Sequence, residues 1–260
     1  MKRPVRNILI AVLLIAVVIT FHTVRRNSTM RGLETIIIEN QRDCLLSVAD
    51  VDSLILTAFP SLTNEDIKNV HCGDVQKMLL QHPYVEEASV EMTTGGKMKT
   101  EITPAVPVVR LFYQNNEFYI SHSGKCLPLA ANHYRHIIVG NVDANEPPLR
   151  NISALNLADT SNHKQPKSLL KIWKMASFLH DNKQYDDVFD QICIDNAGDI
   201  CLVPKLGDMT VVVGDTNDLD KKFENLWAFF EQGISQTGWD TYSVINLKYR
   251  DQVVCTKRNR

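Results

Sequence analysis

The feature that most constrains this chain is an uncharged apolar stretch, Ile8 to Val24, with basic residues on both sides. Its seventeen residues reach the lower limit of the length that crosses a bilayer as a helix. A cleaved signal peptide is the main alternative, because it has a similar basic start and apolar centre. Here the stretch runs into Phe21 and His22 and then Arg25, without a small-residue cleavage site. We therefore predict an uncleaved transmembrane helix over residues 8–24.

The orientation of this helix is set only weakly by charge. Basic residues flank both ends, so the positive-inside rule hardly separates the two orientations. A short basic N-terminus ahead of a large folded body usually stays in the cytoplasm. We expect residues 1–7 to form a cytoplasmic tail, residues 25–32 a linker, and the rest of the chain to lie outside the cytoplasm.

The folded body is acidic although the whole chain is nearly neutral. The first acidic residue of the sequence is Glu34, whereas five basic residues precede Asn27. The remainder carries 23 basic against 30 acidic residues, a balance of −7. Because phosphate attraction supplies most nucleic-acid affinity, this balance argues against a nucleic-acid partner.

The block after the linker predicts a small α+β domain. Ser47 and Asp50 are spaced as a capping box that opens a helix. Asp74 is expected to cap a second helix, because aspartate is a favoured residue at that position. Gly95-Gly96 joins two alternating segments into a hairpin. The expected order is strand 35–38, helices from Ser47 and Asp74, and strands 85–92 and 97–102.

The remainder of the body predicts a mixed α/β domain with a mostly antiparallel sheet and flanking helices. One amphipathic helix covers 167–181, and Asp218 is expected to cap another that ends at Gly233. Two strands close the chain, Tyr242–Tyr249 and Gln252–Thr256. Because the last strand ends the fold, we expect one of its sides to lack a partner strand.

The six cysteines are too dispersed for a disulfide framework, and none forms C-x-x-C. Most are expected to be small buried apolar residues. Cys193 and Cys201 flank Asp195–Asp199, a plausible hairpin turn, and would then lie on adjacent strands. In an exported domain this pair is a candidate disulfide.

No segment matches a known catalytic or cofactor motif, so we predict no enzyme activity, cofactor or metal. Asp218-Leu219-Asp220 has the D-x-D form that binds metal–nucleotide complexes in many type II membrane glycosyltransferases. The same aspartates at a helix start are explained by capping and by the helix dipole.

Three segments follow one another behind the apolar stretch. Leu79–Val90 contains a helix end, a proline and a V-x-x-A-x-V strand. The segment Pro107–Leu129 includes Pro-Val-Val-Arg, Phe-Tyr-Ile and Ser-Gly-Lys-Cys-Leu-Pro. In Val244–Tyr249, Asn246 and Lys248 stand where the related pattern V-D-L-R-Y has Asp and Arg. In this order and spacing the chain resembles FtsQ/DivIB, the bitopic cell-division proteins of bacteria.

The resemblance implies a POTRA domain over 33–103, an FtsQ/DivIB-type β domain over 104–256 and a tail over 257–260. It implies a non-enzymatic divisome scaffold, without cofactor or small-molecule substrate, in the inner or plasma membrane at the septum. Such a scaffold links early and late division proteins and positions septal peptidoglycan synthesis. The implied partners are FtsB/FtsL-type bitopic coiled-coil proteins, and other divisome components at the POTRA domain.

The resemblance also implies where the partner binds. Lys248 and Tyr249 match the family's basic–tyrosine pair, and Asp251, Gln252 and Val253 would supply backbone pairing at the last strand. Alternatively, Tyr249 only packs on its own sheet. Two other functions stay open: a type II membrane glycosyltransferase using Asp218 and Asp220, and another POTRA-bearing export factor.

Overall fold

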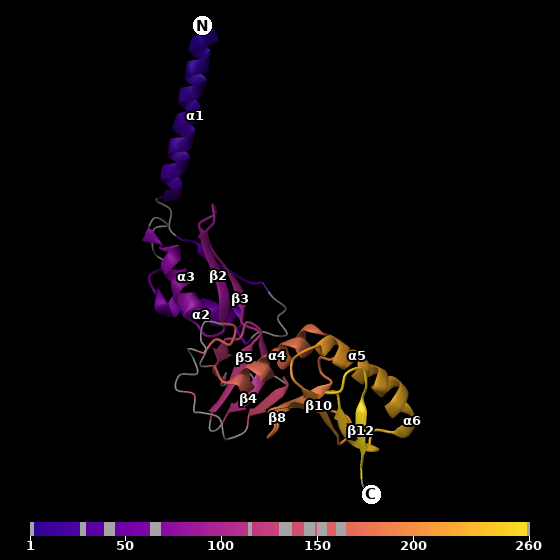
Figure 1. The fold of residues 1–260 in the computed structure, drawn as a ribbon. Coiled ribbons are helices and arrows are strands. Elements are labelled where there is room, and N and C mark those ends of the chain that lie inside the picture. Colours follow the sequence, from indigo (N-terminus) through magenta and orange to yellow (C-terminus); the bar gives the residue numbers. More distant parts are fainter. Residues whose placement is uncertain are drawn as a thin grey trace. The chain divides into compact units, whose positions relative to one another are not determined.

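A computed structural model describes residues 3–26, 30–38, 45–62, 69–113, 116–129, 137–142, 149, 155–159 and 165–258. The chain divides into two compact units, Met1–Ala105 and Val106–Arg260. Each unit has its own β-sheet (Figure 1). Each also has its own hydrophobic core. The architecture is α+β with a large mixed sheet, as predicted. Residues 1–2, 27–29 and 259–260 of the predicted tails and linker lie outside the described residues.

Helix α1 (Arg3–Arg26) contains the apolar stretch that the sequence singles out. Its large apolar side chains from Ile10 to Ile19 are 52–66% exposed, so no part of the described chain covers them. Within the described residues, no helix combines the length and the apolar character needed to cross a membrane. The transmembrane helix over residues 8–24 stays a prediction.

The first unit has the element order that the sequence predicts: strand, two helices and a hairpin. Its three strands are arranged in the order β1-β3-β2, with β1 parallel and β2 antiparallel to the central β3. The elements are β1 (Gly32–Ile37), α2 (Val48–Ala58), α3 (Cys72–Leu80), β2 (Val85–Met92) and β3 (Lys97–Pro104).

Both helices of this unit bury residues spaced four apart, which lie on one face of a helix. These are Val51 and Ile55 of α2 and Val75 and Leu79 of α3, all at most 2% exposed. Alternate residues of the hairpin complete the same core, because successive side chains in a strand point to opposite faces. The hairpin contributes Ala88, Val90, Met98 and Ile102.

The two helix starts differ in how they are capped. At α2 the predicted capping box is confirmed: the Asp50 N–H donates to Ser47 Oγ (3.2 Å) and the Ser47 N–H donates to Asp50 Oδ2 (2.9 Å). The predicted cap at Asp74 is wrong. Helix α3 begins earlier, because the His71 carbonyl already accepts from the Asp74 and Val75 N–H groups. Asp74 lies inside the first turn instead.

The second unit is built on a nine-stranded sheet in the order β12-β11-β10-β9-β8-β7-β4-β5-β6. The pairs β4/β7, β7/β8 and β10/β11 are parallel, and the others are antiparallel. The strands are β4 (Pro107–Tyr113), β5 (Asn116–Ser121), β6 (Cys126–Leu127), β7 (Val139–Val142), β8 (Phe189–Ile194), β9 (Ile200–Pro204), β10 (Thr210–Gly214), β11 (Tyr242–Asn246) and β12 (Val254–Lys257).

Two helical segments pack on this sheet. Helix α4 (Lys167–Asp181) contacts β4, β7 and β8, and α5 (Leu219–Phe229) connects β10 to β11. The helices meet through Phe178 and Phe223, whose ring centroids are 5.0 Å apart. Gly140 of β7 permits the close approach of α4, since a Cβ there would lie 3.0 Å from Ile172.

The prediction that the second helical segment ends at Gly233 is wrong. It continues as a π-helical turn, η5 (Phe230–Ile234), and a short α-helical turn, α6 (Ser235–Thr237), to Gly238 (Figure 1). Gly233 serves packing instead, because a Cβ there would lie 2.7 Å from the Phe229 ring. Gly238 has φ +83 and its N–H donates to the Ile234 carbonyl, so it is the residue that ends the segment.

The two closing strands are shorter than the sequence predicts. Strand β11 ends at Asn246, where the Asn246 side-chain oxygen accepts from the Lys248 N–H (3.0 Å). The Leu247 N–H still donates to the Val212 carbonyl of β10 (2.8 Å), so the chain leaves the ladder only after Leu247. Strand β12 begins only at Val254, so residues 247–253 form the β11–β12 connection.

Replacing Ser47 with alanine should weaken the start of α2. Losing an N-cap typically costs about 1 kcal/mol, which is about fivefold in local opening. Hydrogen exchange of peptides covering α2, measured on the full chain, should quicken by this factor. Ser53→Ala is the matched control, because Ser53 is an exposed residue in the same helix. Equal exchange in both variants would contradict a stabilising role for the capping box.

Candidate functional site

A polar pocket of about 490 Å³ lies beside the β11–β12 connection. The connection forms one wall, and the turn after β10 with the first turns of α5 forms the other. Most of the residues assigned to partner binding from the sequence therefore line one hollow. The lining residues are Asp215, Asn217, Asp218, Lys221, Lys222, Asn225, Leu247, Lys248, Tyr249, Arg250, Asp251 and Gln252.

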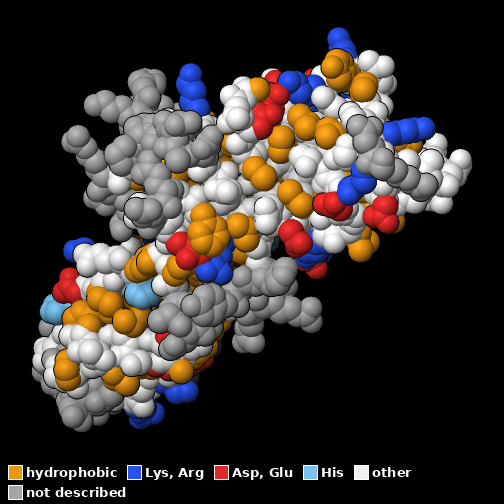
Figure 2. Space-filling view, turned by 90° about the horizontal axis from the view of Figure 1, so that it is seen from below, with side chains coloured by type: hydrophobic (Ala, Val, Ile, Leu, Met, Phe, Trp, Pro, Cys, Tyr) orange, Lys and Arg blue, Asp and Glu red, His pale blue; other side chains and the backbone are white. Residues whose placement is uncertain are grey.

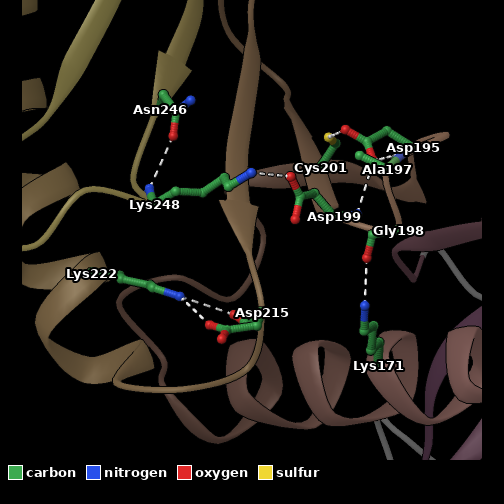
Figure 3. Close-up of polar contacts among 10 residues, drawn as sticks. All are labelled: Lys171, Asp195, Ala197, Gly198, Asp199, Cys201, Asp215, Lys222, Asn246 and Lys248. Atoms are coloured by element: carbon green, nitrogen blue, oxygen red, sulfur yellow. Dashed lines mark hydrogen bonds and ion pairs between the residues drawn. The ribbon is translucent and has the colours of Figure 1, made fainter.

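An ion pair fixes the wall formed by the β10–α5 turn. The Lys222 ammonium lies 2.7 Å from Asp215 Oδ1 and 3.1 Å from the Asp215 carbonyl oxygen, and its side chain is only 15% exposed (Figure 3). Asp215 also accepts from the Asn217 N–H and side-chain amide. Hydrogen bonding from Lys222 lowers the pKa of Asp215, so the carboxylate keeps its charge and the turn keeps its shape.

A second ion pair joins the two walls. Lys221 of α5 pairs with Asp251 of the connection. The bond from Lys221 lowers the pKa of the Asp251 carboxyl, and nearby Arg250 lowers it further. Asp251 has φ 59, in the left-handed region that aspartate tolerates better than most residues. The carboxylate of Asp251 thus attaches the β11–β12 connection to α5.

Lys248 makes a third ion pair, with Asp199 just before β9 (Figure 3). The bond to Asp199 raises the pKa of Lys248, so the ammonium stays charged. The stem of Lys248 passes Gly214 at the end of β10. A Cβ on Gly214 would lie 2.8 Å from Lys248 Cγ, and its φ of +85 also favours glycine.

The other predicted site residues of the connection differ in where they face. Tyr249 is 51% exposed. Val253 is partly buried and packs against the core of the second unit. Gln252 is exposed, and its N–H reaches the Tyr249 carbonyl at 3.5 Å. Tyr249 is therefore the apolar group that the connection presents to solvent.

Strand β12 lies at one end of the sheet order and pairs with β11 on one side. Among the described residues no strand pairs with its other side. The exposed margin is therefore β12 itself, at Val254–Lys257, with Val254 41% exposed. The residues Asp251, Gln252 and Val253, predicted to supply backbone pairing, lie just before this strand and not within it.

The two aspartates of the D-x-D motif do not both line this pocket. Asp218 lines the pocket, whereas Asp220 is absent from its walls. Burial raises the pKa of Tyr185, and the charges of Glu224 and Asp220 raise it further. Asp218 is the N-cap residue of α5, as predicted, but its φ is 50 and its side chain makes no capping bond. No cluster of His, Cys, Asp or Glu suited to a metal occurs within the described residues.

Cys193 and Cys201 are direct cross-strand partners in the β8/β9 ladder, and both are free thiols. The predicted turn between them is present: the Gly198 N–H donates to the Asp195 carbonyl (2.9 Å). Burial raises the pKa of both thiols, that of Cys201 to about 11. The disulfide stays a prediction.

No sequence pattern identifies several of the residues that form this site. Asp199 and Lys248 are separated by 49 positions, and neither lies in a motif that points to the other. Lys221 and Lys222 resemble any exposed lysines of an amphipathic helix. Asp215, the partner of Lys222, lies on the turn just before α5, whereas the folding of the sheet brings Asp251 to Lys221 and Asp199 to Lys248.

A family model described as FtsQ/DivIB, C-terminal related, matches residues 106–256, more than half of the chain. The match covers nearly all of the second unit, with the pocket and all of β12 except Lys257. No curated protein matches the chain.

The raised thiol pKa values predict a steep pH dependence of alkylation. Far below its pKa of about 11, the thiolate fraction of Cys201 rises about tenfold for each pH unit. Peptide mapping after iodoacetamide pulses should show this slope between about pH 8 and about pH 10 on the folded protein. The same protein in urea should react faster at the lower pH. If Cys193 and Cys201 react only after a reductant is added, they are bridged, and the disulfide prediction is confirmed.

Proposed function

We infer a role in cell division for this chain because it belongs to the FtsQ/DivIB, C-terminal related family. We further propose that it is a non-enzymatic scaffold of the divisome. In this role it links early and late division proteins and positions septal peptidoglycan synthesis by binding them.

The observation that carries the proposal is the side of β12 that no described strand pairs with, next to an exposed aromatic residue. An edge strand presents a row of backbone N–H and C=O groups that an extended segment of another chain can pair with. Tyr249 lies in the connection ahead of this strand and is 51% exposed. Aromatic residues at the centre of an interface often contribute much of the binding free energy. The proposed binding surface is Tyr249 together with Val254–Lys257.

The proposed partners at this surface are FtsB/FtsL-type bitopic coiled-coil proteins. Their binding needs no cofactor and no small-molecule substrate. The charge of the described surface fits a protein partner: on the face drawn in Figure 2, basic and acidic side chains are interspersed. A nucleic-acid partner would need a continuous basic area, because it is bound largely through its phosphates.

We propose that the first unit is a POTRA domain that binds other divisome components. Supporting this are its order of strand, two helices and hairpin, and its sheet order β1-β3-β2. Both β1 and β2 are edge strands of this sheet, so an extended segment of a partner could pair with either of them.

We propose that α1 anchors the protein in the inner or plasma membrane as a single-pass type II helix. The exposed apolar side chains from Ile10 to Ile19 support this, because a continuous exposed apolar surface is costly in water. The sequence extends the apolar stretch to Val24. The N-terminus would be cytoplasmic and both folded units extracytoplasmic, at the division septum.

Two alternatives compete with the scaffold. A type II membrane glycosyltransferase would use Asp218 and Asp220, but only Asp218 lines the pocket. Another POTRA-bearing export factor would depend on the first unit and not on Tyr249 or β12.

Tyr249→Ala should lower recovery of the coiled-coil partners about tenfold, as for an interface residue that contributes more than about 1 kcal/mol. A photoreactive amino acid at position 249 or 254 should form adducts with these partners in cells, identified by mass spectrometry. The same amino acid at Lys174, an exposed residue of α4, should not.

The matched control for the tyrosine is Phe112→Ala, since Phe112 is also an exposed aromatic of the second unit, at 41%. The double variant Asp218→Asn with Asp220→Asn should still support division, whereas the glycosyltransferase alternative requires its loss. Full partner recovery by the Tyr249 variant, without adducts at position 254, would favour the export factor.

Replacing Leu14 and Val18 together with lysine should release the protein from membranes during alkaline carbonate extraction. Two charges one helical turn apart make burial of α1 in lipid too costly. Leu14→Ala with Val18→Ala is the control, because it shortens the same side chains without adding charge. A lysine variant that stays with the membrane pellet would contradict anchoring by α1.

A further inference from the structure

The side chain of Lys248 crosses the neighbouring strand, although it is 45% exposed. In the order β11-β10-β9, its ammonium reaches Asp199, which directly precedes β9 (Figure 3). The Lys248 stem crosses the end of β10 at Gly214, where a Cβ would lie 2.8 Å from Cγ and 3.3 Å from Cδ. The absence of a side chain at Gly214 therefore makes room for this path.

The acceptor, Asp199, sits on a turn that is itself held in place. The Ala197 and Asp199 N–H groups donate to Asp195 Oδ1 at 2.9 and 2.8 Å. Lys171 of α4 donates to the Gly198 carbonyl (Figure 3). Asp199 is also the less exposed partner of its ion pair, at 22% against 45% for Lys248. The turn thus offers Lys248 a fixed attachment point on the opposite side of β10.

Arg250, the residue after Tyr249, differs from Lys248 in its contacts. Arg250 is exposed and lines the pocket; its charge acts on neighbouring Asp251, but it makes no hydrogen bond or close ion pair with any described residue. The three lysines of the pocket, in contrast, are each paired: Lys221 with Asp251, Lys222 with Asp215 and Lys248 with Asp199. Arg250 is the cation of the pocket that a partner can reach without breaking an internal pair.

We propose that Lys248 is a positioning residue, and that Arg250 is the cation that meets an acidic group of the partner. Asp199 and Gly214 act with Lys248: together they fasten the start of the β11–β12 connection so that Tyr249 and Arg250 face outwards. Guanidinium pairs with carboxylate in a bidentate geometry, which favours an acidic side chain beside the segment that adds to β12. This inference rests on the proposed function, and it gives Lys248 a different role from direct partner contact.

The decisive experiment exchanges the charges of the pair, Asp199→Lys with Lys248→Asp, in the full-length protein. Two readouts are taken: hydrogen exchange of the peptide covering 247–253, and the yield of the partner adduct from a photoreactive amino acid at position 254. Asp199→Asn alone should quicken exchange and lower the adduct by about fivefold, the effect of losing one modest ion pair. The charge exchange should restore both.

Two further variants test the roles of Gly214 and Arg250. Gly214→Ala should resemble Asp199→Asn, because it blocks the path of the Lys248 stem. Arg250→Gln should lower the adduct and reduce its dependence on salt while leaving the exchange of 247–253 unchanged. Asp187→Asn is the matched control: it removes another exposed ion pair, with Lys205, and should change neither readout.

The outcomes separate this inference from the proposed function. If the charge exchange restores hydrogen exchange but not the adduct, Lys248 itself contacts the partner and the inference is overturned. If Asp199→Asn leaves exchange of 247–253 unchanged, the pair does not position the connection. If the wild-type protein gives no adduct at position 254, the proposed function fails, and hydrogen exchange still decides the role of the pair.

Discussion

The parallel pairing of β10 with β11 is the constraint on which the second unit depends. Parallel neighbours cannot be joined by a tight turn, so the chain must cross over, here through α5, η5 and α6. The crossover brings the carboxyl ends of β10 and β11 to the same edge of the sheet. Because β9 is antiparallel to β10, the start of β9 lies at that edge too. The pocket and the Lys248–Asp199 pair follow from this arrangement.

The apolar core, more than the ion pairs, holds this arrangement together. Val211 and Val213 of β10 and Ile245 of β11 are fully buried, and Phe223 of α5 is buried with them. Burying such side chains contributes about 1.5–3 kcal/mol each relative to exposure. The ion pairs around the pocket lie at the surface, where water and salt weaken them. They orient the connection on a platform that the core has already fixed.

A modest binding surface suits the proposed scaffold. A short edge strand with one exposed aromatic residue offers few contacts compared with a large permanent interface. Attachment of both partners to one membrane would raise their effective concentration, so that a weak contact suffices. The first unit has its own sheet and core, and under the proposed function it binds other division proteins independently.

The amino-acid sequence by itself determined most of the local elements, but not all of their ends, together with the α+β class and the family resemblance. Local signals sufficed for these: the capping box at Ser47, the Gly95-Gly96 hairpin and the four-residue spacing of Val51 and Ile55 are each contained within one segment. The tertiary structure alone decided which residues of the connection face outwards. Strand β11 ends already at Asn246, and Val253 packs against the core. Lys248 pairs with Asp199 on the other side of β10. The physical reason is that strand pairing joins residues far apart in the chain, and no local pattern records that pairing.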